Sequence, residues 1–177
     1  MPKILESMRE QLLTEARRQI ESRGYAKTTI RSVAAGCGIA VGTVYNYFPS
    51  KEMLIATFLS EDWRACIAPI AEDVEDDAKT YLKRIYDAIR SFTDTYRSLF
   101  SDDEAKIAYY AAFSQRHGQL RKQIAALILP VCGEQPDRVF LSEFIAEALL
   151  TWTREERPFE DIYTLMQKLI SKEREEK

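Results

Sequence analysis

An all-α fold follows from three features of the sequence. The chain has only six glycines and six prolines among its 177 residues. Apolar residues recur at intervals of three and four through most of its length, which is the spacing of one face of a helix. Residues that cap or end helices separate these stretches. We predict about nine helices, as a three-helix module over residues 1–50 followed by a helical bundle over residues 51–177.

Two short helices near the N-terminus are joined by a tight turn. The first is predicted over residues 29–37, with Thr28 or Thr29 as its N-cap. The second is predicted over residues 41–47. Gly38 supplies the conformational freedom that a sharp turn between two helices needs. This arrangement is a helix-turn-helix, whose second helix enters the major groove of DNA.

Local signals bound the other helices. Ser50 can cap a fourth helix, which Pro69 ends or kinks. Residues 101–104, Ser-Asp-Asp-Glu, have the form of a capping box, and His117-Gly118 marks a break after which His117 is expected in an exposed loop. The predicted helices run over about residues 4–23, 29–37, 41–47, 50–67, 77–99, 101–117, 118–131, 137–154 and 159–173.

Charge is divided unevenly along a chain whose net charge is −3. Residues 1–53 hold eight basic and five acidic side chains, a net charge of +3. The other 17 basic and 23 acidic residues give −6. A basic excess on the module that would meet phosphates weakly favours nucleic-acid binding.

Other classes of protein are disfavoured. No stretch approaches the ~20 apolar residues of a membrane span, and the N-terminal sequence lacks a signal-peptide core, so a cytoplasmic location is expected. Cys37, Cys66 and Cys132 lack metal-ligand spacing and are expected to be reduced thiols, with redox sensing by Cys37 left open. With one histidine, no Gly-rich phosphate loop and no nucleophile beside a base, the chain is predicted to be no enzyme and to hold no cofactor or metal.

Ordered motifs follow the first helix: Thr28-Thr29-Ile30-Arg31, Gly38-Ile39, Gly42-Thr43-Val44-Tyr45-Asn46-Tyr47-Phe48 and Ser50-Lys51-Glu52. Over about residues 5–55 the sequence resembles the TetR family of bacterial transcription regulators. Beyond residue 60 it is similar to that family only in its helical layout. The resemblance implies a homodimer that binds a palindromic double-stranded DNA operator and responds to a small-molecule effector.

The resemblance also implies which residues contact DNA. Hydroxyls and cations are expected to bind phosphates, while Tyr45 and Asn46 read base edges. Packing of Tyr45 or Tyr47 against the first helix is the alternative for those two rings. The predicted DNA-contacting residues are Thr29, Arg31, Val41, Gly42, Thr43, Tyr45, Asn46, Tyr47 and Lys51.

Three positions depart from the family pattern. Ala40 stands where Ser or Thr is usual, so the helix over 41–47 lacks a side-chain cap, a loss of about 1 kcal/mol. Val41 stands where the family commonly has a polar or basic residue. Its side chain is expected to contact a thymine methyl group instead. Gly36 should loosen the end of the helix over 29–37. These departures bear on operator strength and base preference.

Aromatic residues crowd the helices after residue 60. Each of these aromatic residues, taken alone, is most simply interpreted as part of the core. Several of them, however, carry a hydroxyl or an indole N–H group, which needs a hydrogen-bond partner when it is buried. Because TetR-like proteins hold an effector pocket here, the resemblance implies that some of these residues line a pocket for a largely apolar or planar ligand. The candidates are Trp63, Ile67, Tyr86, Ile89, Phe92, Tyr96, Tyr109, Tyr110 and Phe113.

The last two helices carry apolar residues around more than one face. One face can pack on the core, and the excess predicts a second copy of the chain. A two-fold dimer would place two recognition helices about one DNA turn, ~34–36 Å, apart. The predicted interface residues are Phe140, Phe144, Ala148, Trp152, Ile162, Met166 and Leu169.

The predicted function is that of a homodimeric, ligand-responsive transcription regulator, a repressor that a small, largely apolar effector releases from its operator. The alternative is a protein-interaction or architectural member of the same fold with weak or no operator recognition. Ala40, Val41 and the low total charge favour that alternative, and steeply salt-dependent binding to a specific duplex would count against it.

Overall fold

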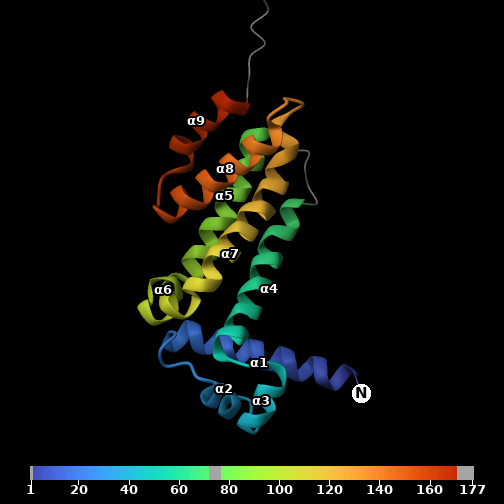
Figure 1. Ribbon diagram of the computed structural model, residues 1–177, viewed down its shortest axis with the longest axis vertical. Coiled ribbons are helices and arrows are strands. Elements are labelled where there is room, and N and C mark those ends of the chain that lie inside the picture. The colour runs from blue at the N-terminus through green and yellow to red at the C-terminus, as the bar shows by residue number, and fades with distance from the viewer. Residues whose placement is uncertain (1, 72–76, 171–177) are drawn as a thin grey trace, which may run out of the picture. The chain divides into compact units, whose positions relative to one another are not determined.

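The prediction of an all-α fold is confirmed. The computed structural model describes residues 2–71 and 77–170, without the side chains of residues 2–6 and 108–116, and this part of the chain contains helices and no strand (Figure 1). None of the described helices is both long and apolar enough to span a bilayer. The elements are α1 (Pro2–Arg23), α2 (Ile30–Gly36), α3 (Val41–Tyr47), α4 (Lys51–Ala71), α5 (Ala78–Thr95), α6 (Arg97–Ser101), α7 (Asp103–Ile128), the 3-10 helix η1 (Leu129–Cys132), α8 (Arg138–Arg154) and α9 (Phe159–Ile170).

The chain divides into two compact units. The N-terminal unit contains the residues up to Ala65 together with Thr95–Ala111. The C-terminal unit contains the described residues of Cys66–Asp94 and those from Ala112 onward. Helix α4 therefore begins in one unit and ends in the other. The sequence-based boundary at residue 50 lies at the start of this helix.

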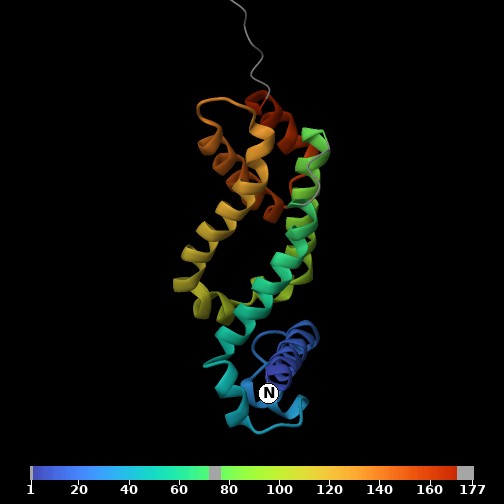
Figure 2. The same ribbon diagram turned by 90° about the vertical axis from the view of Figure 1, so that its right-hand side faces the viewer.

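Helices α1, α2 and α3 bury one face each in the N-terminal unit. Helix α1 packs on α2, and α2 packs on α3 (Figure 2). Leu12, Ala16 and Ile20 lie on the buried stripe of α1, while α2 and α3 contribute Val33 and Val44. All five side chains are at most 1% exposed. Burial of a large aliphatic side chain contributes about 1.5–3 kcal/mol, so this core can hold the three helices together.

An ion pair joins α1 to α4 inside the same unit. Arg17 donates from Nε and Nη2 to the two carboxylate oxygens of Asp62, at 2.7 and 2.6 Å. The Tyr96 hydroxyl donates to Oδ2 of the same carboxylate. The hydrogen bond with Asp62 is the main reason that the pKa of Arg17 is raised. A two-pronged contact of this kind fixes the orientation of the two helices as well as their separation.

The prediction of one helix over residues 77–99 is wrong, because Tyr96 separates α5 from α6. Tyr96 is the N-cap of α6, with φ −105° and ψ 20°. Its ring lies 5.9 Å from that of Phe58, and its side chain is buried. Leu99 is buried beyond the break. The apolar spacing therefore continues through a point where tertiary contacts have turned the backbone.

The break predicted at His117-Gly118 is absent, and α7 runs through both residues. Nε2 of His117 lies 2.9 Å from Oε2 of Glu147 on α8. Ile124 and Ile128, further along α7, are completely buried. A glycine within a helix costs about 1 kcal/mol relative to alanine, and these contacts offset that cost. His117 is thus a half-buried helical residue and not a loop residue.

Two helix ends also differ from the predictions. Ser101 is the last residue of α6, and Asp102 caps α7 by accepting the backbone N–H of Ala105 at 2.9 Å. Pro69 lies inside α4, which continues to Ala71. The last three residues of the helix predicted over 159–173 lie outside the described residues.

The C-terminal unit places α8 and α9 side by side, as Figures 1 and 2 both show. The Tyr86 hydroxyl of α5 donates to the Arg157 carbonyl oxygen at 2.8 Å. The rings of Tyr86 and Phe159 lie 5.5 Å apart. Helix α5 therefore supports the connection from α8 to α9.

The Arg17–Asp62 pair should contribute measurably to stability. Its two side chains are 28% and 26% exposed, so solvent screens the pair only in part. We predict that Arg17→Met lowers the free energy of unfolding by about 1–2 kcal/mol in urea denaturation. Arg9, which pairs with Glu61 between the same two helices, is the matched control. Because that pair is 41% and 38% exposed, Arg9→Met should cost less than about 1 kcal/mol. Equal losses in the two variants would contradict the assignment.

Candidate nucleic-acid interface

Thr29, and not Thr28, caps α2. Its side chain accepts the backbone N–H of Ser32 at 3.0 Å, while the Ser32 hydroxyl accepts the Thr29 N–H at 2.9 Å. Thr28 is buried, and its hydroxyl donates to the Gly24 carbonyl oxygen at 2.9 Å. The reciprocal capping box holds Thr29 at the exposed start of α2. This is the place where the sequence predicts a phosphate contact.

Gln19 of α1 anchors this capping box through Ser32, and it is absent from the predicted site residues. The side chain is 1% exposed. Its amide donates to the Ser32 carbonyl oxygen at 3.0 Å, and its oxygen accepts the Ser32 hydroxyl at 2.5 Å. The same amide also donates to Glu15 at 2.6 Å. A buried polar group is stable only when it is paired in this way, so Gln19 fixes the position of α2 on α1.

Glu15 supports Gln19 from within α1. It accepts two hydrogen bonds from Arg18, at 2.8 and 2.6 Å. These bonds are the main reason that its pKa falls from 4.5 to about 2. A carboxylate with a lowered pKa stabilises the folded state fully above its ordinary value of 4.5, and this contribution is lost as the pH falls toward 2.

The turn between α2 and α3 requires Gly38. Its φ of 67° lies in the left-handed region, where a side chain is strained. The N–H groups of Gly38 and Ile39 donate to the carbonyl oxygens of Ala35 and Ala34, at 3.1 and 3.0 Å. These bonds close the end of α2. The structure also confirms that Ala40, the N-cap of α3, makes no side-chain capping bond.

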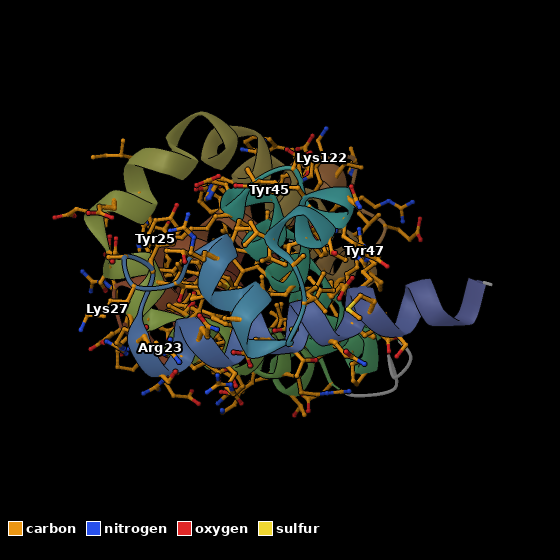
Figure 3. All side chains as sticks on the ribbon, turned by 90° about the horizontal axis from the view of Figure 1, so that it is seen from below. Arg23, Tyr25, Lys27, Tyr45, Tyr47 and Lys122 are labelled. Atoms are coloured by element: carbon orange, nitrogen blue, oxygen red, sulfur yellow. The ribbon has the colours of Figure 1, made fainter. Side chains whose placement is uncertain are left out.

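Helix α3 is buried through Val44 and exposed on its opposite face. Tyr45, which is labelled in Figure 3, is 52% exposed. Asn46 is also exposed. Tyr47 is intermediate. A Cβ added at Gly42 would meet no atom within 4 Å. The alternative in which Tyr45 packs on α1 therefore does not hold for this ring, and the outer face of α3 is open to a large partner.

Residues from α2, α3 and the start of α4 surround one open surface hollow of about 510 Å³. Five of the nine residues predicted to contact DNA line it, so the fold brings together sequence positions up to 22 apart. These five are Thr29, Arg31, Val41, Tyr45 and Lys51, and the other lining residues are Ile30, Pro49, Ser50 and Glu52. Gly42, Thr43, Asn46 and Tyr47 belong to the same short helix α3.

Lys51 is more strongly held than a phosphate-binding lysine on an open surface. Its ammonium donates to the Tyr25 carbonyl oxygen at 2.5 Å and lies 3.4 Å from the centre of the Tyr25 ring. Burial lowers the pKa of Lys51, while Glu52, Glu104 and Asp102 act in the opposite direction. Both Lys51 and Tyr25 belong to the N-terminal unit, at the start of α4 and just after α1.

Tyr25 and Glu52 complete the surroundings of this lysine. Tyr25 is 4% exposed and donates its hydroxyl to Oε1 of Glu52 at 3.1 Å. Burial first, and then the charge of Glu52, raises the pKa of Tyr25 to about 12. The hydroxyl therefore remains protonated and keeps donating at neutral pH. Local sequence patterns do not reveal this contact, because its two partners lie 27 positions apart.

Cys37 lies beside the turn between α2 and α3. Its thiol donates to the Gln11 carbonyl oxygen at 3.7 Å. Burial, and then the charge of Glu15, raises its pKa. A thiol with a raised pKa forms less of the reactive thiolate, which disfavours the redox-sensing interpretation.

The residues predicted to line an effector pocket fall in both units. Trp63 and Tyr96 are buried in the N-terminal unit, where the Tyr96 hydroxyl bonds to Asp62. Tyr86 and Ile89 are buried in the C-terminal unit. Ile67 and Phe92, also in the C-terminal unit, are partly exposed. The side chains of Tyr109, Tyr110 and Phe113 are not among those that the structure describes. The effector pocket remains a prediction.

The residues predicted at a dimer interface separate into two groups. Phe140, Phe144 and Leu169 are 73%, 50% and 41% exposed. Ala148 and Trp152 are intermediate, whereas Ile162 and Met166 are buried in the core of the C-terminal unit. Ile162 and Met166 therefore support α9 from within the subunit. Two further exposed residues outside the predicted interface set, Val139 and Leu165, lie on the same two helices.

An all-helical chain whose third helix stands outward after a tight glycine turn defines a helix-turn-helix protein. A family model described as "Bacterial regulatory proteins, tetR family" matches residues 12–57. The chain is 30% identical over 67 residues to the HTH-type transcriptional regulator UidR of Escherichia coli K12, which covers 38% of this chain and 34% of UidR. It is 28% identical over 127 residues to the HTH-type transcriptional repressor KstR2 of Mycobacterium tuberculosis H37Rv, which covers 66% and 62% of the two chains.

Among solved structures, BioQ with its natural double-stranded DNA operator has a similar fold. The TM-score is 0.61 at 17% identity, over 93% of this chain and 98% of BioQ. This likeness concerns the fold, and the family match concerns the helix-turn-helix. Over residues 12–57 the chain is therefore similar to the tetR family of bacterial regulatory proteins.

Gln19 should be the most costly polar residue of this region to remove. We predict that Gln19→Ala lowers the free energy of unfolding by about 1–3 kcal/mol, because the Ser32 carbonyl and hydroxyl groups lose their buried partner. Urea denaturation followed by circular dichroism measures the loss. The control is Gln11→Ala on the exposed side of the same helix, which should change stability by less than about 0.5 kcal/mol. A loss no larger than that of the control would contradict the role of Gln19 in fixing the position of α2 on α1.

Proposed function

We propose that this protein is a homodimeric transcription regulator that binds a specific DNA operator through the outer face of α3, with phosphate contacts from the starts of α2 and α4. The observation that carries the proposal is the shared surface hollow, which is lined by Thr29, Tyr45 and Lys51. A hydroxyl and a cation suit phosphate oxygens. Tyr45 lines the same hollow and is exposed, so it can reach a base edge in the major groove.

The family's relatives support the proposal. KstR2 is named a transcriptional repressor. BioQ has been crystallised with its double-stranded operator. We infer repression as the mode of regulation, with a small, largely apolar effector that favours a conformation unsuited to DNA. The aromatic residues of the predicted effector pocket are the candidates for binding it.

Selection of bound duplexes from a random pool tests operator recognition directly. The wild-type protein should enrich one palindromic sequence, because a two-fold dimer presents its two recognition helices symmetrically. The Tyr45→Ala, Asn46→Ala double variant should fail to enrich it. Ile107→Ala, a change at a residue of α7 that is 78% exposed, is the control and should enrich the same sequence. If a folded, dimeric wild-type protein enriches nothing at low salt, the interaction or architectural alternative is favoured.

Gly42 offers a test that separates stability from DNA binding. We predict that Gly42→Ala stabilises the folded protein by up to about 1 kcal/mol, because alanine favours a helix and its Cβ meets no atom within 4 Å. The same methyl group should weaken operator binding about tenfold or more, since one poor contact of about 1.4 kcal/mol suffices for that factor. Thermal unfolding and fluorescence anisotropy measure the two effects. Unchanged affinity would show that DNA does not approach the backbone at this helix.

The exposed apolar residues of α8 and α9 are proposed to form the dimer interface. Phe140, Phe144, Val139, Leu165 and Leu169 are all at least 41% exposed. We predict that Phe140→Glu, Phe144→Glu converts the protein to a monomer in sedimentation velocity experiments, because a buried carboxylate pair disfavours association. Ile107→Glu alters an exposed apolar residue outside these helices and should leave the dimer intact. A wild-type protein that sediments as a monomer at micromolar concentration would contradict this interface.

A further inference from the structure

Lys51 is held by Tyr25 at the surface that is proposed to face DNA. We propose that Tyr25 is a positioning residue, which fixes the Lys51 ammonium over its ring so that the ammonium can bind a DNA backbone phosphate without leaving the ring. The inference rests on the proposed DNA-binding function and deepens it. It assigns a specific task to a residue that lies outside the recognition helix and outside the surface hollow.

Two contacts determine where the ammonium lies. Nζ of Lys51 is 2.5 Å from the Tyr25 carbonyl oxygen and 3.4 Å from the centre of the Tyr25 ring. The first contact uses one of its three N–H donors, and the second is a cation–π contact at short range. At least one donor is left for a phosphate oxygen. Since Lys51 lines the same hollow as Thr29, that donor can serve the phosphate region.

The ring is itself fixed at both ends. Tyr25 is 4% exposed and lies in the connection between α1 and α2. Its hydroxyl donates to Glu52 at 3.1 Å, in the first turn of α4. Tyr25 therefore joins the end of α1 to the start of α4. Because the ring is held in place, the Lys51 ammonium that contacts it is held as well. A lysine side chain on an open surface would instead sample many rotamers.

The two groups in direct contact with the ammonium favour an anion at this position, whereas the carboxylates of Glu52, Glu104 and Asp102 raise the pKa of Lys51 and oppose a further negative charge. The carbonyl oxygen and the ring are both uncharged partners, so neither neutralises the ammonium. Burial disfavours its charged form, which a phosphate would stabilise. A lysine already ordered in the free protein also loses less conformational entropy when the phosphate binds. If Lys51 had to leave Tyr25 before DNA could bind, its contacts with the Tyr25 carbonyl oxygen and ring would both be lost on binding.

Duplex binding over a series of salt concentrations tests the positioning role. Tyr25→Leu and Lys51→Met should each weaken binding about three- to tenfold and reduce the magnitude of the salt slope by about one counterion, as expected for one lost phosphate contact. The double variant should bind no more weakly than Lys51→Met alone, because the two residues act through one contact. Tyr25→Phe keeps the ring and should restore most of the affinity. Lys83→Met, a lysine of α5 paired with Asp87, is the charge-matched control.

A second measurement does not depend on the folding of Tyr25→Leu. The ε-methylene resonances of Lys51, assigned by comparison with Lys51→Met, should be shifted upfield by the ring in the free protein. They should remain so in the complex with DNA. Loss of the ring shift on binding, or wild-type affinity in a folded Tyr25→Leu variant, would overturn the positioning role while leaving DNA binding in place. Failure of the wild-type protein to bind any duplex at low salt would overturn the proposed function and this inference together.

Discussion

The hydrogen-bonded ion pair between Arg17 and Asp62 is the constraint on which the N-terminal unit depends. It ties the middle of α1 to α4, and the Tyr96 hydroxyl adds the junction of α5 and α6 to the same carboxylate. Hydrophobic burial is non-directional, so apolar packing alone does not fix the angle between these helices. A two-pronged guanidinium–carboxylate contact fixes that angle, and its partial burial keeps solvent from weakening it greatly.

Two further polar contacts position residues at the candidate DNA surface. Gln19 holds the capping box of Thr29 and Ser32, so α1 sets the position of α2. Tyr25 holds Lys51, so the end of α1 sets the position of a cation at the start of α4. In both cases a buried residue of or beside α1 places a residue that lines the surface hollow. Binding residues are thus supported by a rigid layer, which reduces the entropy lost on association.

The sequence predicted those features that local chemistry determines. Thr29, Gly38 and the exposed Tyr45 depend on capping, a left-handed turn and helical spacing, and all three can be recognised from neighbouring residues. The break at Tyr96 and the unbroken helix through Gly118 could not be predicted, since contacts with Phe58, Asp62 and Glu147 decide them across long sequence separations. The partners of Gln19 and Lys51 were missed for the same reason. Ile162 and Met166 were predicted at the dimer interface but are buried within the subunit. When apolar residues surround a whole helix, the sequence does not reveal which face packs inside the subunit.

We propose that one face, formed by the starts of α2 and α4 and the outer side of α3, meets DNA. Amide hydrogen exchange of the whole protein, measured with and without its selected duplex, tests this proposal. We expect exchange to slow over residues 29–32 and 41–51, while exposed amides of α8 keep their rates at a fixed dimer concentration. Protection of α8 and α9 by DNA, with residues 41–47 unchanged, would contradict it.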